Sequence, residues 1–446
     1  MSQISFSNEV AMLRFEKGWL LLIPLTLALS TIHCQIFEGD IETELKECVQ
    51  LNQNKTSDRS AVYASTEDIY THCLQLFLWK SEIVQWKGFN ITEKDRDFIN
   101  SLIGSFVRSG RTKRQTNQAY PQTGFRIRRE YRMLSVEERT AFHSAINQMK
   151  MTGQYDVFAN LHQGAILNLI HGGPNFFGWH RVYIALMEEA LRRIDPSLSL
   201  PYWDSTLDFD MVNPDNSIIW SSQFLGNGGG VVATGPFANW ATPIGQLTRN
   251  ISRAGILFRK EDISAIMTRC RISDISEPTA LDQFNLELAH GGPHIWVGGQ
   301  MSGLNTAAHD PAFFLHHAFI DYIWDMFRWN QIQVCGINPL TDYQTTLGVR
   351  AAQPMAAFPA YRNIVGYSFD WSNHWYAYER SPTCSWSRPF CGTPYLRCDI
   401  TRQRCVSVER TEEEFPTRRT GTPTLRIGPR FRSPPTDPRI LNARKK

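Results

Sequence analysis

Histidines gathered in two short windows are the residues of this chain best suited to chemistry. The chain has 12 histidines, and eight of them fall within residues 162–180 and 290–317. A lone histidine on a helix is usually structural, but two dense clusters indicate metal binding, because imidazole is the commonest metal ligand. The candidate ligands are His162, His171 and His180 in the first window and His290, His294, His309, His316 and His317 in the second.

The all-imidazole character of these clusters favours copper. Non-heme iron sites usually include a carboxylate, and di-iron bundles use Glu-x-x-His pairs, and we expect neither pattern beside these histidines. Neutral nitrogen donors suit both Cu(I) and Cu(II), so two triads indicate a pair of copper ions. A three-histidine zinc site stays possible for either triad alone, although it would not explain two.

The spacing of His290 and His294 places both on one face of a helix, since they are four residues apart. The intervening Gly291-Gly292-Pro293 disfavours a regular helix, because glycine and proline are its poorest formers. We therefore expect His290 at or just before a helix start.

The adjacent His316 and His317 point about 100° apart around a helix, so both are not expected to bind one metal ion. Phe313, His317, Ile320 and Trp324 share one stripe, which favours His317 as the ligand. His316 also has apolar neighbours, so periodicity alone leaves the choice open.

Helices are the elements expected to position these side chains. Helical patterns cover residues 126–150, 155–169, 180–194 and 311–329. Ser135 can cap the first before Glu137 and Glu138, and Asp310 can cap the last before Pro311. Strand signals are few and short, and the glycines within 226–230 indicate a turn. The sequence therefore predicts a mainly α fold, in which a helix bundle can hold metal between inward-facing side chains.

Residues 1–34 have the pattern of a secretory signal. Arg14 and Lys17 precede the short apolar run 19–29, and no other apolar run reaches spanning length. The alternatives are a membrane anchor or a buried helix. We expect cleavage, and thereafter no membrane association.

Residues 35–114 form an N-terminal extension or propeptide, because the stretch ends in Arg111-Thr-Lys-Arg114, a dibasic sequence of the kind that furin-like enzymes cut. An ordinary solvated charge run is the alternative. We place the catalytic domain at 115–380, and a cysteine-rich segment with a disordered basic tail at 381–446.

Cysteine use agrees with export. Signal cleavage near Cys34 leaves eight cysteines, an even number suited to disulfides in an oxidising compartment: Cys48, Cys73, Cys270, Cys335, Cys384, Cys391, Cys398 and Cys405. The last four lack the C-x2-C pair of a zinc knot, so disulfides are expected, with a connectivity that the sequence does not determine. Sequons at Asn54, Asn90 and Asn250 are compatible with glycosylation of a secreted protein.

The overall composition gives no reason to expect a nucleic-acid partner. The 46 basic and 43 acidic residues nearly balance, with a net charge of +3. Hydrophobic residues make up 42% and aromatic residues 12%, which is ample for a large core.

At the histidine windows the sequence resembles the tyrosinase family of type-3 copper proteins, which also includes catechol oxidases and molluscan hemocyanins. The first signature is His162 followed by the motif at 171–181, His-Gly-Gly-Pro-Asn-Phe-Phe-Gly-Trp-His-Arg. The second is His290-Gly-Gly-Pro-His294 followed by the motif at 310–321, Asp-Pro-Ala-Phe-Phe-Leu-His-His-Ala-Phe-Ile-Asp. The resemblance covers about residues 120–380.

The resemblance implies a ligand set and a fold. The ligands of the first copper would be His162, His171 and His180, and those of the second His290, His294 and His317. Phe313 would pack on the ligand imidazoles, and His316 would stay outside the ligand shell. No catalytic residue is implied beyond the ligands. The implied fold is a four-helix bundle holding the binuclear centre, with irregular loops and a disulfide-rich C-terminal extension.

The implied reaction is the oxidation of catechols, or the hydroxylation of monophenols, with dioxygen as co-substrate. Secreted molluscan tyrosinase-like proteins of shell matrix and periostracum look most similar, so the substrates could include tyrosyl or DOPA side chains of matrix proteins. Two positions depart from other members. Leu169 stands where some members have a thioether-forming cysteine, and Gly291 stands where hydroxylating members often have asparagine.

Two rival functions use the same histidines. A hemocyanin-like oxygen carrier normally adds a β-sandwich over the copper site, which the short region after residue 376 does not supply. A matrix structural protein with a vestigial copper site would require blocked access, because all six histidines are present.

Overall fold

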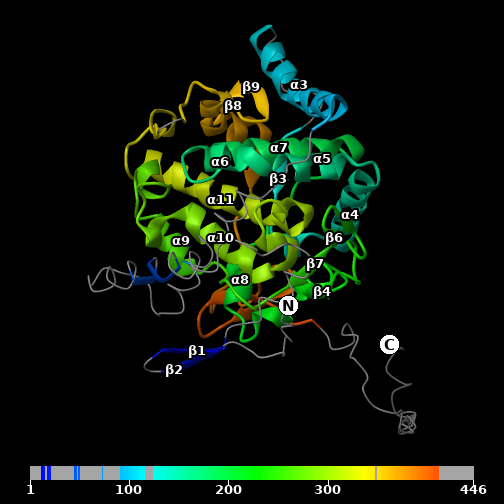
Figure 1. Cartoon of the computed structure of the whole chain (residues 1–446), viewed down its shortest axis with the longest axis vertical. Coiled ribbons are helices and arrows are strands. Elements are labelled where there is room, and N and C mark those ends of the chain that lie inside the picture. The colour runs from blue at the N-terminus through cyan, green and yellow to red at the C-terminus, as the bar shows by residue number, and fades with distance from the viewer. Residues whose placement is uncertain are drawn as a thin grey trace, which may run out of the picture. The chain divides into compact units, whose positions relative to one another are not determined.

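Helices around a buried centre form most of this protein (Figure 1). The computed structural model describes residues 91–115, 124–346 and 349–410, with short pieces at 12–15, 18–21, 45–47, 49–50 and residue 73. The helices are α3 (Glu93–Gln115), α4 (Val136–Met151), α5 (Gln154–Leu161), α6 (Leu167–Ile170), α7 (Asn175–Ile194), α8 (Thr206–Phe209), α9 (Lys260–Ile266), α10 (Leu286–Val297) and α11 (Ala312–Gln333). The predicted mainly α fold is confirmed.

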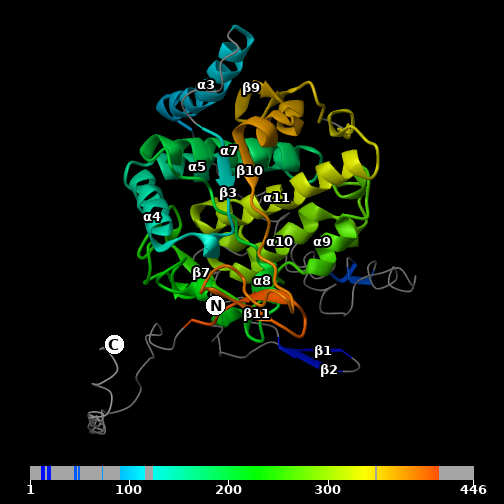
Figure 2. The same ribbon diagram turned by 180° about the vertical axis from the view of Figure 1, so that it is seen from behind.

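Short strand pairs lie at the edges of the helical body. The antiparallel pairs are β1 (Met12–Phe15) with β2 (Gly18–Leu21), β4 (Gly229–Val231) with β7 (Thr248–Asn250), β5 (Ala241–Thr242) with β6 (Gly245–Gln246), β8 (Pro354–Met355) with β9 (Phe358–Arg362), and β11 (Leu396–Asp399) with β12 (Arg404–Ser407). One pair is parallel: β3 (Arg126–Arg128) lies beside β10 (Tyr376–Tyr378), as Figure 2 shows.

The two long helices α7 and α11 pack against each other at the middle of the body. Helix α7 is buried from Asn175 to Leu191, including the charged Arg181, Glu188 and Glu189. A helix that is buried all round belongs to the interior. Helices α5 and α10 flank this pair, so four helices surround the place where the histidines meet.

The expected helix over 126–150 begins ten residues late. Ser135 caps α4 with a full capping box, in which its side chain accepts from Glu138 N and the Glu138 side chain accepts from Ser135 N. The N-cap prediction is therefore confirmed, but the assignment of Arg126–Arg128 to a helix is wrong. These residues form β3 because they pair with a strand 250 residues later in the chain.

The arginines of β3 explain why that stretch is buried. Arg128 donates to Glu188 on α7 and is within 3.4 Å of Asp321 on α11. Burial opposes the charged form of Arg128, but Glu188 and the neighbouring tyrosines more than offset this and raise its pKa. Arg126 and Arg128, which the sequence assigned to a helix, thus form buried ion pairs from a strand.

The other expected helices differ mainly at their boundaries. The 155–169 pattern is broken after α5 by Gln163 and Gly164, and only α6 continues it. Helix α7 begins at Asn175, ahead of the expected His180. Helix α11 begins as predicted, and Asp310 Oδ1 accepts from Ala312 N at 2.9 Å.

Helix α10 corrects the expectation that His290 lies at a helix start. The helix begins at Leu286, capped by the Asn285 side chain, and runs through Gly292 and Pro293. Tertiary packing overrides the poor propensity of this stretch. A Cβ on Gly292 would lie 2.5 Å from Ile256 O, so the glycine allows the 255–257 segment to pack directly on the helix.

Disulfides organise the C-terminal extension, as predicted from the cysteine pattern. Cys384 pairs with Cys398, Cys391 pairs with Cys405, and Cys270 pairs with Cys335. The first two cross in sequence and hold the β11–β12 hairpin. The extension contacts α8 through β12, and Ser407 hydrogen-bonds to Ser217.

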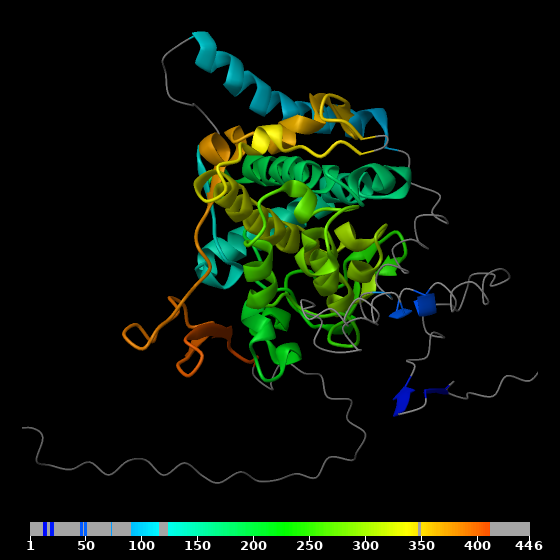
Figure 3. The same ribbon diagram turned by 90° about the vertical axis from the view of Figure 1, so that its left-hand side faces the viewer.

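Helix α3, the upper helix in Figure 3, packs one apolar face on the body. Its buried residues Ile99, Leu102, Ile103 and Phe106 belong to the main core. The Phe106 ring lies 4.6 Å from the ring of Trp375. The part of the N-terminal extension formed by α3 is therefore built into the fold.

Several predictions fall outside the described residues: most of the apolar run 19–29, the sequons Asn54 and Asn90, and the tail beyond 410. Asn250 is described and is exposed at the end of β7. In the part of the chain that the structure describes, no helix is long and apolar enough to span a membrane.

Candidate metal centre

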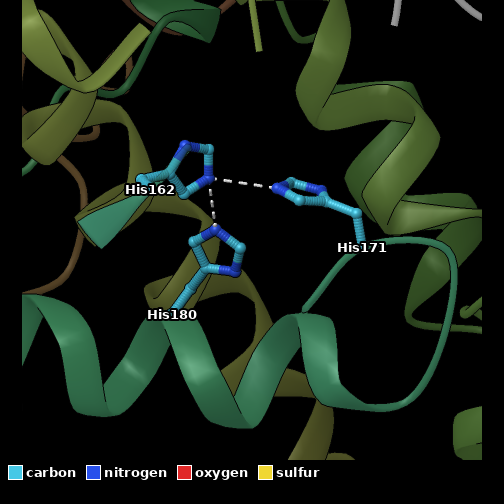
Figure 4. Close-up of side chains that lie close together, drawn as sticks. All are labelled: His162, His171 and His180. Carbon is cyan, nitrogen blue, oxygen red and sulfur yellow. Dashed lines mark hydrogen bonds between the residues drawn. The ribbon is translucent and has the colours of Figure 1, made fainter. Parts of the chain in front are cut away.

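The first three histidines converge from three different places (Figure 4). His162 follows α5, His171 follows α6, and His180 lies in the second turn of α7. Their ring nitrogens point at one another: His162 Nε2 lies 3.1 Å from His171 Nε2 and 3.2 Å from His180 Nε2. The first window of the sequence is thus a spatial triad.

The second triad comes from two helices. His290 and His294 lie one turn apart on α10, and His317 lies on α11. One ring nitrogen of each lies within 4.8 Å of the others, and His294 Nε2 is 3.3 Å from His317 Nε2. His180 of the first triad stacks on His317 at 4.5 Å between ring centroids, so the two triads face each other.

The hydrogen bonds of the Nδ1 atoms determine whether the converging Nε2 atoms carry a lone pair that can bind a metal ion. Nδ1 of His162 donates to Leu304 O, that of His171 to Glu287 Oε1, and that of His180 to Phe176 O. A neutral imidazole that donates through Nδ1 carries a lone pair on Nε2. Three lone pairs at this distance repel one another unless a cation lies between them. The first triad therefore fits a metal ion.

The second triad follows the same rule at two of its members. Nδ1 of His290 hydrogen-bonds to Glu287 O, and Nδ1 of His294 donates to Met301 O at 2.9 Å. His317 differs, since among the described residues its buried Nδ1 has no hydrogen-bond partner. These backbone acceptors fix ring orientation, as partners of metal-bound histidines usually do.

Burial keeps the imidazoles neutral. Desolvation, reinforced by the neighbouring histidines, lowers the pKa of five of them well below the ordinary value: His162, His180, His290, His294 and His317. Neutral imidazole is the form that binds metal, so the site is prepared for a cation. His171 is the one member of the two triads that is not classed as buried, although its side chain is only 7% exposed, so the centre is nearest to solvent at this residue.

Aromatic rings close the opposite side. Phe313 stacks on His317 with 4.1 Å between ring centroids and lies 4.9 Å from His162 and 5.7 Å from His294. Its ring is fully buried. Phe313 therefore contacts imidazoles of both triads and excludes water between them.

Glu287 is the functional residue that the sequence reasoning gave too little weight. It is three residues before His290, a Glu-x-x-His spacing that we did not expect beside the clusters. The structure uses the carboxylate differently from a di-iron ligand: Oε1 accepts from His171 Nδ1 at 3.1 Å and from Gly172 N at 2.8 Å. Glu287 thus orients His171, which lies on the loop after α6.

We expect Glu287→Ala to weaken metal retention by about 10- to 100-fold, because the loop histidine loses its orienting partner. Glu287→Gln should retain most of the affinity, since the amide oxygen can accept the same two hydrogen bonds. Metal loss to a chelator, followed over time, measures both. Equal losses in the two variants would show that the charge of Glu287 matters, and the hydrogen bonds do not.

His316 lies outside both triads. Its Nε2 donates to His290 O at 2.8 Å, and its ring stacks parallel to that of His290, with 5.7 Å between centroids. The residue therefore supports the backbone of α10 beside the triad. The helical stripe that favoured His317 points to the histidine that the structure places in the triad.

His309, also a candidate in the second window, lies apart from the triads on a 3-10 turn. Burial, with a contribution from Lys150, lowers the pKa of His309 to about 4. Its Nδ1 is 4.0 Å from Asp156 Oδ1, and among the described residues neither ring nitrogen has a hydrogen-bond partner. The structure thus removes His309 from the possible ligands.

Comparison with known proteins agrees with this geometry. A family model, the common central domain of tyrosinase, matches residues 152–330, which contain all six triad histidines. A tyrosinase-like protein of Pinctada maxima is 34% identical over 401 residues, covering 81% of this chain and 85% of that protein.

Two further similar proteins match a smaller part of this chain. A tyrosinase-like protein of Caenorhabditis elegans is 37% identical over 291 residues, which are 61% of this chain and 41% of that protein, so the chain spans less than half of that relative. Among solved structures, a polyphenol oxidase variant of Thermothelomyces thermophila is similar with a TM-score of 0.49 and 19% identity, covering 65% of this chain and 99% of that chain.

Proposed function

The chain belongs to the tyrosinase family, and from this premise we propose that it oxidises catechols to o-quinones with dioxygen at a binuclear copper centre. Family members bind two copper ions, and two triads are the number that a pair requires. We assign His162, His171 and His180 to the first copper and His290, His294 and His317 to the second.

The observation that carries the proposal is the pair of facing triads of Nε2 atoms. Copper bound there supplies two-electron redox chemistry between dioxygen and a catechol. Two catechols lose four electrons and four protons, which reduce one dioxygen to two waters and leave two o-quinones. The side chains of this chain hold the donors in place and surround them with the apolar rings of Phe313 and Phe176.

Access is proposed from the side of His171, the partly exposed member of the triads. Phe313 blocks the opposite side, where its ring covers His317 and His162. Burial keeps the other five triad histidines neutral before any substrate binds, because it lowers the pKa of each of them.

Oxygen uptake on a catechol tests this proposal. We expect copper-loaded protein to consume one dioxygen for two molecules of 4-methylcatechol, with o-quinone formation followed by absorbance. Reversible oxygen binding with no consumption would instead support the hemocyanin-like rival. Neither consumption nor binding in fully loaded protein would support a vestigial site.

The balance between diphenols and monophenols is proposed to depend on Gly291. It lies in α10 next to His290, is buried, and has a backbone that accepts an L side chain, because its φ is not positive. Monophenol oxidation needs a base for the phenolic proton, and a side chain here could orient a water for it. Without that side chain, the buried Oε2 of Glu287, one turn before Gly291 on α10, is an acceptor that has no hydrogen-bond partner among the described residues.

We therefore expect faster oxidation of L-DOPA than of L-tyrosine, and a several-fold gain on L-tyrosine in Gly291→Asn. Gly291→Ala is the matched control, because it adds bulk without a polar group. Steady-state rates on both substrates measure the effect. Comparable efficiencies on the two substrates in the unmodified protein would reject the idea.

The extracellular setting is also a proposal. The disulfides Cys270–Cys335, Cys384–Cys398 and Cys391–Cys405 are typical of an oxidising compartment. We propose a secreted protein with a signal at 1–34 and a catalytic domain at 115–380 followed by the cysteine-rich segment. Phenolic side chains of matrix proteins are then possible natural substrates besides small catechols, and the reaction would serve cross-linking or pigmentation.

Cleavage after Arg114 is expected to leave the N-terminal fragment attached. The basic sequence lies at the end of α3, whose residues Ile99, Leu102 and Phe106 are buried in the core. N-terminal sequencing should find a chain that begins at Gln115, and the two fragments should separate only under denaturing conditions. A single mature start near residue 35 with an intact chain would contradict processing.

A further inference from the structure

A pocket that opens to solvent lies on the outer side of α4, outside the metal centre. Its volume is about 740 Å³, and it is lined by residues of helix α4 together with Ser222, Gln223 and Pro236. The polar lining includes Arg139, Thr140, His143, Ser144 and Ser222. None of the triad histidines contributes to it, so the cavity is a separate feature of the fold.

Arg139 differs from the other buried arginines of the described chain. Six of the seven have a carboxylate within 4.0 Å, namely Arg126, Arg128, Arg132, Arg181, Arg249 and Arg328. Arg139 is only 3% exposed and forms no ion pair with any described residue. A buried charge without a counter-charge is unfavourable, so this position calls for an anion.

Neutral groups hold the Arg139 guanidinium in place. Nε donates to Gln223 O at 3.0 Å, and one terminal nitrogen donates to the Tyr395 hydroxyl at 3.0 Å. The guanidinium carbon lies 4.2 Å from the ring centroid of Phe224 and 4.7 Å from that of Tyr395. These contacts orient the cation, and the exposed Glu137 is close enough to interact with it but forms no ion pair with it.

His143 offers a second donor at the same wall. The buried hydroxyl of Tyr131 hydrogen-bonds to His143 Nε2 and has no other acceptor among the described residues, so it donates. The proton of the neutral imidazole then lies on Nδ1, which no described residue accepts. Burial, assisted by Arg139, lowers the pKa of His143 to about 3, which keeps the ring neutral.

We propose that this cavity binds a small organic carboxylate with an apolar body. The carboxylate pairs with the Arg139 guanidinium and accepts from His143 Nδ1. The apolar part lies against Val136, Met151 and Pro236 at the rim, two of which are large exposed apolar side chains. The volume lies in the usual range of organic ligand sites and is far larger than one inorganic anion needs.

Calorimetric titration of the copper-loaded protein with hexanoate tests the proposal, with inorganic phosphate as the competing anion. We expect one hexanoate per chain, bound more tightly than phosphate. Arg139→Gln should weaken binding by about tenfold or more, because a charge-assisted hydrogen bond is lost. Arg271→Gln is the matched control, since it removes one exposed charge from another face and should leave the affinity unchanged.

A second variant decides the matter if Arg139→Gln does not fold. Ser144 is exposed on α4 and lines the cavity, so Ser144→Trp fills the space while keeping Arg139. We expect it to weaken hexanoate binding by a similar factor. A carboxylate held by copper would bind Ser144→Trp and the unmodified protein equally, and that result overturns the proposal. Tighter binding of phosphate than of hexanoate, or no saturable binding, also overturns it.

Discussion

Replacing His317 or His180 by alanine is expected to reduce catechol oxidation to background. Each side chain supplies one Nε2 donor to its triad, and their rings stack on each other across the centre. Loss of either leaves two donors for one copper and opens a gap beside the other triad. Copper per chain, measured together with oxygen uptake, should fall from two toward one.

His316→Asn is the matched control for His317→Ala. His316 donates to His290 O from the neighbouring position of α11, and an asparagine amide can make a similar bond. We expect two coppers per chain and measurable turnover, with some loss of stability because the buried ring is removed. Loss of copper in His316→Asn with copper retained in His317→Ala would reverse the assignment of the second triad.

Asp321→Ala is expected to give the largest loss of stability among the single substitutions considered. Asp321 on α11 accepts from Arg181 Nε at 2.6 Å, from the Tyr376 hydroxyl at 2.6 Å and from the Tyr378 hydroxyl at 2.7 Å. It also lies 3.4 Å from Arg128. Removing it leaves Arg181 with only the partly exposed Asp325 and leaves two buried tyrosine hydroxyls without their acceptor, at a cost of about 3–5 kcal/mol. Urea-induced unfolding measures the change.

Asp325→Asn provides the comparison on the same helix. Asp325 pairs with Arg181 at 3.1 Å but its side chain is 13% exposed, so water can replace part of the interaction. We expect a clearly smaller loss than at Asp321. Equal losses would show that the effect is general to α11 and does not come from the buried network.

The same network makes a prediction about acid. Burial alone would raise the pKa of Asp321, but Arg181 and Arg128 outweigh it and hold the pKa below its ordinary value. A depressed folded-state pKa gives stabilisation that is present above the unfolded value of about 3.9 and is lost as the pH falls. The unfolding free energy of the unmodified protein should therefore decrease below about pH 4, and Asp321→Asn should lack this part of the decrease.

Local signals in the sequence were sufficient for elements set by neighbours along the chain. The Ser135 N-cap and the start of α11 next to Asp310 depend on residues one to three positions away. The Ser135 cap is confirmed, and α11 begins at Ala312, whose backbone N–H donates to the Asp310 side chain. The strand β3 could not be found this way. Arg126 and Arg128 owe their burial to Glu188, Glu189 and Asp321, partners that lie about 60 to 193 residues away.

In the candidate site, too, features set by neighbouring residues were predictable and features set by distant residues were not. The histidine windows are dense enough to see in the sequence, but helix α10 was misjudged because Gly292 and Pro293 are poor helix formers. Packing of Ile256 on Gly292 stabilises the helix there, and it is a contact between residues 36 positions apart. Glu287 could have been found from its place one turn before His290, but its partner His171 is 116 residues away.

The sequence likewise did not determine which cysteines pair. Four cysteines between 384 and 405 allow three connectivities. The structure shows the crossed pairing, Cys384–Cys398 with Cys391–Cys405. Cys398 and Cys405 lie opposite each other in the β11–β12 hairpin, yet each bonds to a cysteine outside the hairpin.

Metal content measured together with the oxygenated spectrum tests the central claim most directly. The two triads of Nε2 donors predict two coppers per chain and an absorption band that appears on oxygenation and disappears when oxygen is removed. The His317→Ala protein should lack the band while His316→Asn retains it. One tightly bound zinc ion per chain, with no oxygen-dependent band after full copper loading, would contradict the binuclear copper assignment.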